Sequence, residues 1–408
     1  MLQNRRHFLR TLTGGSALLS LTPGAPGWLV RAAAETRADR DGTVLVVLQL
    51  SGGNDGLNCV VPFTHDAYQR ARPTLRLPAR EVLRLTDELG LHPKLAGFKA
   101  LYDAGHLAIV QGVGCPKLSR EHDRAMRTWH VADPEPDGRE TGWVGRAADA
   151  WAARTGGIHT PALFVGGIAR PFALNAARSI LPVVRHAGEM RSRTEPPPPG
   201  ERPAPADRPL LAHVRRVAAS ARAQEARLRA LAAEAGAGDR GYPDFALARD
   251  LRLVARLIRA DLGTRIFYTE LGGGGIGGFD NHANQKDNHA ALLAQLAEAV
   301  AAFVRDLRRD GLLERVLLLT CSEFGRTLAE NGRRGTGHGE AAPLFLTGGA
   351  VRGGLHGEHP SLTDLDNGAL RHHVDFRRLY AGVLGDWLGL DAPALLAGDF
   401  PPLTLWAR

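Results

Sequence analysis

The chain has 408 residues, of which 44% are hydrophobic and 23% charged, so it can bury the core of a large globular domain. Its formal net charge is +8, but four arginines lie within the first 34 residues, and the remainder carries only +4. The basic residues are not interleaved with aromatic ones, which argues against nucleic-acid binding. Three widely separated cysteines exclude a closed disulfide framework and a cysteine-rich zinc site.

The first 34 residues have the features of an export signal. Arg5 and Arg6 precede a weakly hydrophobic stretch rich in Gly, Ser, Thr and Leu, and an alanine run at 32–34 provides a cleavage site. This pattern resembles a twin-arginine signal peptide, which directs folded proteins to the twin-arginine export machinery. We therefore expect a periplasmic or extracellular protein. No later segment is long and apolar enough to span a membrane.

The segments that follow alternate between strand and helix patterns. Continuous runs of β-branched residues and leucine predict buried strands, and longer amphipathic stretches predict helices. This alternation indicates an α/β fold with a mostly parallel central sheet flanked by helices. Ser119 and Asp375 are expected to cap the helices that follow them. The predicted strands span residues 43–50, 107–113, 162–167, 264–271, 314–324 and 343–349, and the predicted helices 120–130, 288–310 and 375–390.

An insertion is expected within a single domain that spans residues 43–408. Residues 188–209 are rich in proline and predict an irregular loop. Residues 210–235 and 244–262 both have helical composition and apolar spacing, so residues 188–262 are interpreted as a loop followed by a helical hairpin. The arginines of this hairpin are expected to form a solvated face.

Polar side chains follow almost every predicted strand. Because ligands of open α/β sheets bind beyond the carboxyl ends of the strands, these side chains are expected to converge at one edge. Carboxylates and imidazoles are ligands of zinc, manganese and similar divalent ions, and two such ions can act together on a phosphoryl group. The residues in these positions are Asn54, Asp55, Ser119, Arg120, His122, Asp280, His282, Glu323 and His338.

Several of these residues also have a purely structural interpretation. Asp55 lies in an Asn-Asp-Gly sequence that favours a turn, Ser119 could act only as a helix cap, and Glu323 could be a paired structural carboxylate. We expect His289 to face solvent or to cap the next helix. The glycines of 273–278 satisfy G-x-G-x-x-G but do not lead directly into a helix, so no dinucleotide cofactor is expected.

Six stretches of the chain form a characteristic set of motifs: LQLSGGNDGLNCVVPF, LAIVQGVGCPKLSREH, GGFDNHANQ, LLLTCSEFGRTLAENG, GHGEAAPLFLTGG and VRGGLHGEHPSL. Together they resemble the DUF1501 family, which groups with the alkaline phosphatase/sulfatase superfamily. The resemblance covers about residues 43–390 and implies an alkaline-phosphatase-like fold.

The superfamily resemblance also implies roles for individual residues. Ser119 would be the nucleophile. The position of Arg120 beside Ser119, and not the resemblance, leads us to expect that Arg120 holds a non-bridging oxygen of the substrate. One divalent ion, zinc or manganese, would be bound by Asp280, His282 and His338, and a second would lie between Asp55 and Glu323. The chain departs from the superfamily pattern at Glu323-Phe324, where Asp-His is common, and at Gly337, where an aspartate is common. These departures leave open whether one or two ions are bound.

We therefore expect an exported metal-dependent hydrolase that acts on small or polymeric phosphate, sulfate or related esters through Ser119. The alternative is a non-catalytic envelope protein that binds a ligand or partner on a degenerate phosphatase-like scaffold. In that case, replacing Asp280 or His338 would cause little loss of metal or stability. A third hypothesis is that the arginine-rich hairpin binds an anionic polymer, with strong salt dependence.

Overall fold

A computed structural model describes residues 42–155, 160–184, 240–272 and 278–407. The residues from Thr43 onward cluster into one compact unit. Its centre is a twisted sheet in the strand order β13-β5-β12-β9-β1-β8-β6-β7, with β16 paired to β5. The bounds are β1 Val44–Leu50, β5 Leu107–Gly114, β6 Ala162–Val165, β7 Val183–Val184, β8 Ile266–Leu271, β9 Val316–Cys321, β12 Ala342–Gly348, β13 Gly354–His356 and β16 Val374–Asp375.

The sheet is mostly parallel, as predicted. Strand β1 runs parallel to both β8 and β9, and β6 runs parallel to β8. Strand β12 is antiparallel to both of its neighbours, β9 and β5, so β5 again points the same way as β9. The carboxyl ends of β1, β5, β8 and β9 therefore meet at one edge of the sheet, where ligand sites of such folds lie.

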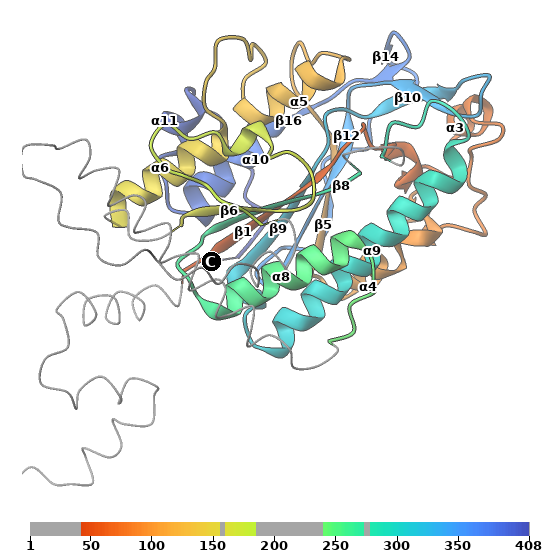
Figure 1. Cartoon of the computed structure of the whole chain (residues 1–408). Coiled ribbons are helices and arrows are strands. Elements are labelled where there is room, and N and C mark those ends of the chain that lie inside the picture. The colour runs from red at the N-terminus through yellow and green to blue at the C-terminus, as the bar shows by residue number, and fades with distance from the viewer. Residues whose placement is uncertain (1–41, 156–159, 185–239, 273–277, 408) are drawn as a thin grey trace, which may run out of the picture. The chain divides into compact units, whose positions relative to one another are not determined.

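Helices cover both faces of this sheet (Figure 1). The α4, α8 and α9 helices lie on one face, and α5, α6, α10 and α11 lie on the other. Alternate residues of β1 explain the two layers, because Val44, Val46 and Leu48 pack into one hydrophobic cluster and Leu45 and Val47 into the other. The helix bounds are α4 Ala96–Asp103, α5 His122–Val131, α6 Trp143–Thr155, α8 Ala246–Ala260, α9 Gln285–Arg309, α10 Phe376–Gly382 and α11 Ala392–Leu396.

Most predicted elements are confirmed, and the differences concern where helices begin. The Asp375 side chain caps α10 by accepting a hydrogen bond from the Arg377 amide, as expected, and a π-helical turn, Val383–Trp387, continues that helix. Ser119 is not the cap of α5, because Glu121 occupies the N-cap position. Helix α8 is the second helix of the predicted hairpin. The first, over 210–235, lies outside the described residues, as do the proline-rich loop and the export signal.

Two smaller sheets lie beside the main one, and a buried ion pair joins the loop after β1 to one of them. These sheets have the orders β11-β10-β15-β14 and β2-β4-β3. Arg72, which ends helix α3 (Asp66–Ala71), donates two hydrogen bonds to Asp55 and others to the carbonyl oxygens of Thr327 and Leu328 in β10. It therefore joins the loop after β1 to α3 and β10. The strand bounds are β2 Val60–Val61, β3 Leu83–Arg84, β4 Gly90–Leu91, β10 Arg326–Glu330, β11 Thr336–His338, β14 Leu365–Asp366 and β15 Ala369–Leu370.

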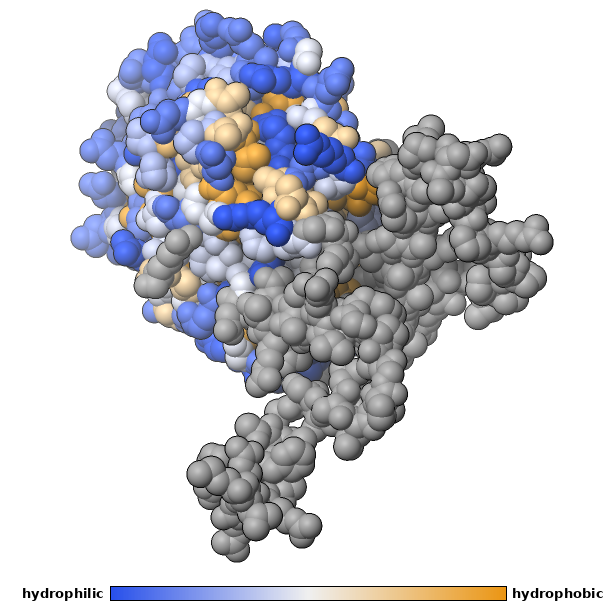
Figure 2. Space-filling model, turned by 90° about the vertical axis from the view of Figure 1, so that its left-hand side faces the viewer, coloured by the Kyte–Doolittle hydropathy of each residue, from blue (hydrophilic) through white to orange (hydrophobic). Residues whose placement is uncertain are grey.

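Hydrophilic residues dominate the face shown in Figure 2, with apolar residues gathered toward its middle. Among the described residues, Ile180 and Val183 are the large hydrophobic side chains left exposed. No helix in these parts of the chain has both the length and the apolar composition needed to cross a bilayer.

Replacing Arg72 by methionine is expected to destabilise the fold by about 3–5 kcal/mol, because Asp55 would remain as an unpaired buried charge. Urea unfolding followed by circular dichroism measures this loss. Arg70→Met is the matched control, since Arg70 belongs to the same helix and its pair with Asp66 is exposed. The control should change stability by no more than about 0.5 kcal/mol. Equal effects of the two changes would contradict the importance of the buried pair.

Candidate metal centre

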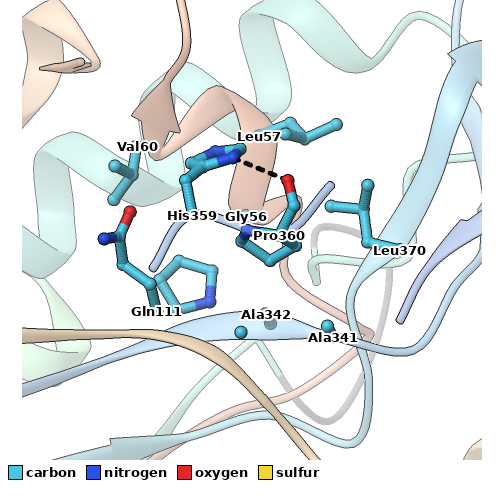
Figure 3. A pocket seen from close by; sticks show the side chains of 11 residues that line it. Gly56, Leu57, Val60, Gln111, Ala341, Ala342, His359, Pro360 and Leu370 are labelled. Atoms are coloured by element: carbon cyan, nitrogen blue, oxygen red, sulfur yellow. Dashed lines mark hydrogen bonds between the residues drawn. The ribbon is translucent and has the colours of Figure 1, made fainter. Parts of the chain in front are cut away.

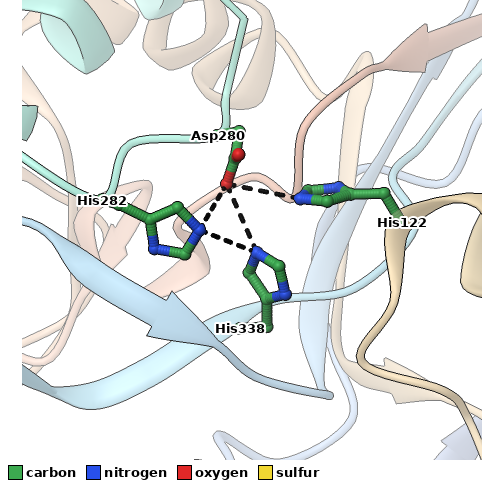
Figure 4. Close-up of side chains that lie close together, drawn as sticks. All are labelled: His122, Asp280, His282 and His338. Carbon is green, nitrogen blue, oxygen red and sulfur yellow. Dashed lines mark hydrogen bonds and ion pairs between the residues drawn. The ribbon is translucent and has the colours of Figure 1, made fainter.

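Four side chains converge beyond the carboxyl edge of the sheet: His122, Asp280, His282 and His338 (Figure 4). One ligand atom from each lies within 4.8 Å of those of the other three. The Asp280 Oδ1 atom is 3.0 Å from His282 Nε2 and 3.4 Å from the Nε2 atoms of both His122 and His338. The three imidazoles thus present the same ring nitrogen to a single carboxylate oxygen.

The chain brings these side chains together from three places. Asp280 and His282 lie between β8 and α9, His338 ends β11, and His122 begins α5 just beyond β5. Close backbone contacts hold the segments in place. A Cβ at Gly335 would lie 2.2 Å from the carbonyl carbon of His282, and one at Gly52 would lie 2.4 Å from the Asp280 nitrogen. Gly52 also has φ +116°, so both close approaches depend on glycine.

Each histidine is oriented by a hydrogen bond at its other ring nitrogen. The Nδ1 of His282 lies 2.9 Å from the Thr336 carbonyl oxygen, and that of His338 lies 2.6 Å from the Arg120 carbonyl oxygen. Because a carbonyl oxygen can only accept, both Nδ1 atoms donate, and in the neutral rings both Nε2 atoms carry a lone pair. His122 Nδ1 lies 2.9 Å from Glu323 Oε1. Imidazole ligands of metal ions are commonly held in this way.

The Nε2 atoms of the three histidines are arranged to bind a cation. The Nε2 atoms of His282 and His338 are 2.9 Å apart, and two lone pairs at that distance repel each other unless a proton or metal ion lies between them. His122 Nε2 is buried and has no hydrogen-bond partner. Three imidazole nitrogens and a carboxylate oxygen suit zinc or another divalent transition metal.

Neighbouring charges shift the pKa values of the cluster in opposite directions. Burial opposes the ionisation of Asp280, but the hydrogen bond and charge of Arg326 outweigh it and hold the carboxyl pKa below its ordinary value. The Glu323 hydrogen bond raises the pKa of His122. Burial lowers the pKa of His338, and the positive charge of Arg326 adds to this effect. The shifts of Asp280 and His338 therefore favour the carboxylate and the neutral imidazole that metal binding needs, whereas the shift of His122 favours its protonated form.

Ser119 and Arg120 lie next to the cluster in sequence, but other groups engage their side chains. Ser119 is half-buried, and its Oγ accepts a hydrogen bond from the Glu121 amide at 3.1 Å. It precedes the N-cap position of α5 by two residues. The Arg120 guanidinium pairs with Asp366 at 2.8 Å, while its backbone carbonyl orients His338. The catalytic roles predicted for both residues remain predictions.

The structure does not bring Asp55 and Glu323 into the four-residue cluster. Both carboxylate oxygens of Asp55 bind Arg72, and one also accepts from Gln285. Glu323 is buried, and its Oε1 accepts from the Gly52 amide and faces His122 Nδ1. Glu323 thus lies outside the cluster and contacts it through His122, the candidate ligand that it orients.

Two further buried or partly buried histidines, His289 and His359, lie outside the metal cluster. His289 was expected to face solvent or to cap the next helix, and both expectations are wrong. It is buried on α9, where Asn284 is the N-cap residue, and its Nε2 lies 3.0 Å from Asn54 Oδ1. Helix α9 begins at Gln285, three residues earlier than predicted, so His289 lies within the helix and not at its start. His359 lines a small cavity (Figure 3), where it contacts the carbonyl oxygen of Pro360, and the buried Gln111 Oε1 has no protein partner. This cavity is water-sized, about 20 Å³, and no member of the metal cluster lines it.

His122 and Arg326 are the residues whose importance the sequence did not reveal. His122 was recognised among the polar residues after its strand, but only the fold shows that it points at Asp280. Its position in the first turn of a helix after a strand end was the available signal. Arg326 is fully buried and lies 2.8 Å from Asp280 Oδ1. Nothing in its residue type or spacing distinguished it from the many other arginines.

Comparison with known proteins confirms the resemblance to one family. Residues 206–398 match the model of the DUF1501 family, described as a protein of unknown function. A search of curated proteins found no match.

Several solved structures resemble the chain at low identity, where the likeness concerns the fold alone. The zinc complex of the C-terminal periplasmic domain of EcEptC from Escherichia coli is 9% identical, with a TM-score of 0.36 and coverage of 76% of this chain and 74% of that one. A Vibrio parahaemolyticus protein of the alkaline phosphatase superfamily is 10% identical, with a TM-score of 0.38 and coverage of 89% and 71%. Murine ectonucleotide pyrophosphatase/phosphodiesterase 5 is 9% identical, with a TM-score of 0.40 and coverage of 86% and 96%.

Replacing Glu323 by glutamine is expected to weaken metal binding about 10- to 100-fold at pH 8, because His122 loses the carboxylate that orients it. The same change should shift the pH dependence. Glu323 raises the pKa of His122, so protons displace the metal as the pH falls through that raised value, and in the variant this loss should occur at lower pH. Titration of the metal-free protein with zinc at several pH values measures both effects.

The matched control for this experiment is Glu121→Gln. Glu121 is exposed next to His122 in sequence, and its side chain does not cap α5. The control should leave the zinc affinity and its pH dependence unchanged. Indistinguishable zinc titrations for Glu323→Gln and Glu121→Gln would show that Glu323 does not act on the metal centre.

Proposed function

We propose that this protein is a metal-dependent hydrolase of phosphate, sulfate or related esters, with its centre at His122, Asp280, His282 and His338. The observation that carries the proposal is the convergence of three Nε2 atoms on Asp280 Oδ1, with each imidazole anchored through Nδ1. When bound, a divalent cation supplies Lewis-acid polarisation of the ester and neutralises the charge that develops at its oxygens.

The residues around the cluster have distinct roles in this proposal. The three histidines and Asp280 hold the cation, and Arg326 and Glu323 fix Asp280 and His122 in position. Asp280 has a side chain that is 44% exposed, so the centre is open to a substrate from solvent. Ser119, three residues before His122, would attack the ester centre and expel the alcohol, and water would then release the acid from the serine.

The proposed export of the protein rests on its sequence alone. The paired Arg5 and Arg6 with the following weakly hydrophobic stretch support twin-arginine export to the periplasm or beyond. In that compartment the substrate would be a small or polymeric anionic ester.

A structural metal site is the second candidate, and one observation favours it. Four protein donors are enough to complete a tetrahedral zinc site, whereas catalytic zinc sites usually have three protein ligands and an open position. In this case the protein would be a non-catalytic envelope protein stabilised by its metal. Stoichiometric metal without turnover of any ester would favour this candidate over the hydrolase.

The mature chain, purified without the first 34 residues, should contain a stoichiometric transition metal by elemental analysis and should turn over members of a panel of aryl phosphates, phosphodiesters and aryl sulfates. Asp280→Ala and His338→Ala should lose both the metal and the activity, since each removes one ligand atom. Asp364→Ala, at an exposed aspartate paired with Arg371, provides a control outside the cluster for metal content. If the wild-type protein carries no stoichiometric metal and turns over none of these esters, the proposal is wrong.

Ser119→Ala distinguishes a serine nucleophile from direct attack by water. If Ser119 forms the covalent intermediate, kcat/KM should fall by about 10³-fold or more, while the metal content stays that of the wild type. Acid quenching during turnover of a phosphate ester should trap a phosphoryl group on Ser119, detectable by mass spectrometry. Ser361→Ala, at an exposed serine whose hydroxyl bonds only within its own loop among the described contacts, should have no effect. Full activity of Ser119→Ala would exclude the serine mechanism.

A further inference from the structure

We infer that the centre holds a single divalent cation, because the buried guanidinium of Arg72 occupies the Asp55 carboxylate that a second cation would need, and the buried guanidinium of Arg326 adds a fixed positive charge beside Asp280. This inference rests on the proposed metal centre and specifies its stoichiometry. A second cation between Asp55 and Glu323 would require free carboxylate oxygens on both residues.

Asp55 has no free oxygen to offer. Its Oδ1 accepts from Arg72 at 2.9 Å, and its Oδ2 accepts from Arg72 at 2.6 Å and from Gln285 at 2.5 Å. The side chains of Asp55 and Arg72 are almost completely buried, which strengthens their attraction and makes the loss of either partner costly. The pair is also held from outside, because Arg72 donates to two carbonyl oxygens of β10. A divalent cation would have to displace this guanidinium to reach Asp55.

Arg326 occupies the space between the loop after β1 and the segment that carries the metal ligands. Its guanidinium donates to the carbonyl oxygens of Gly52, Gly53 and Phe279 and to Asp280 Oδ1. The side chain is fully buried, so the positive charge cannot move away into solvent. The immobile positive charge of the Arg326 guanidinium therefore already contacts Asp280, on the side that faces the Gly52–Gly53 turn.

Glu323 is also engaged. Its Oε1 accepts from the Gly52 amide at 2.8 Å and faces His122 Nδ1 at 2.9 Å. Its Oε2 lies 3.2 Å from the Ser322 hydroxyl, which shares its single proton with the Leu50 carbonyl oxygen at 2.8 Å. Its contacts fix the loop after β1 and the His122 ring. Residues that hydrogen-bond to a metal ligand commonly orient that ligand in this way.

The charges of these groups agree with one cation. With the imidazoles neutral, the carboxylates of Asp55, Asp280 and Glu323 and the guanidiniums of Arg72 and Arg326 leave one net negative charge. One divalent cation changes this to a single positive charge, which attracts an anionic ester. Two cations would leave three positive charges, and the Asp55 and Glu323 carboxylates that would face the second cation are buried and already hydrogen-bonded. Such uncompensated charge is costly away from water.

Metal titration of the complete mature protein tests the inference. After removal of metal and dialysis, Co²⁺ is titrated in while the visible absorption of the bound ion is recorded, and the expected end point is one equivalent per chain. In a parallel sample, two equivalents of Mn²⁺ are added and the electron paramagnetic resonance spectrum is recorded. An uncoupled spectrum is expected, whereas a spin-coupled pair would overturn the inference.

The double variant with Asp55→Asn and Arg72→Gln provides the matched comparison, since it removes both charges of the pair together. Thermal unfolding first establishes that it is folded. A retained end point of one equivalent supports the inference. Two equivalents in the wild type overturn it, as does a folded double variant that binds no metal. No binding of Co²⁺ or Mn²⁺ to the wild type would instead remove the proposed metal centre itself, so the two failures are distinguishable.

Discussion

The guanidinium of Arg326 joins the segments on which the metal cluster is built. It is buried without an exposed atom on its side chain, and its hydrogen bonds go to the turn after β1 and to the segment between β8 and α9. A buried cation is stable only when surrounding acceptors compensate for lost hydration. Three carbonyl oxygens and the Asp280 carboxylate do so, and in return their positions become fixed.

The hydrogen bonds of Arg326 explain how a glycine-rich turn can form part of a defined site. The turn after β1 contains Gly52 and Gly53, both with positive φ, and glycine-rich backbone loses much conformational entropy on ordering. Arg326 binds both of their carbonyl oxygens, and Glu323 binds the Gly52 amide. The same two side chains also fix Asp280 and His122. The two side chains that order the turn are therefore the same ones that orient the metal ligands.

The arrangement also relates the site to the sheet. Strands β1, β5, β8 and β9 end at one edge, and His122, Asp280 and Glu323 follow three of them. His338 comes from outside the main sheet, on β11, which pairs with β10 through Arg326 opposite His338. The small sheet thus delivers both the last ligand and the arginine that orients Asp280. Its attachment through Arg72 to Asp55 makes the buried ion pair part of the support for the metal centre.

The α/β class, the buried strands and most of the polar residues at strand ends could be predicted from the amino-acid sequence, because apolar periodicity is a local property of the chain. The sequence also identified Asp280, His282 and His338, whose segments match the family resemblance. It did not determine that His122 completes the cluster, that Asp55 is bound to Arg72, or that His289 is buried. Those facts depend on which distant groups meet each carboxylate. Arginines at positions 72 and 326 look like any others in the chain, and only the tertiary structure decides that these two are buried against acidic side chains.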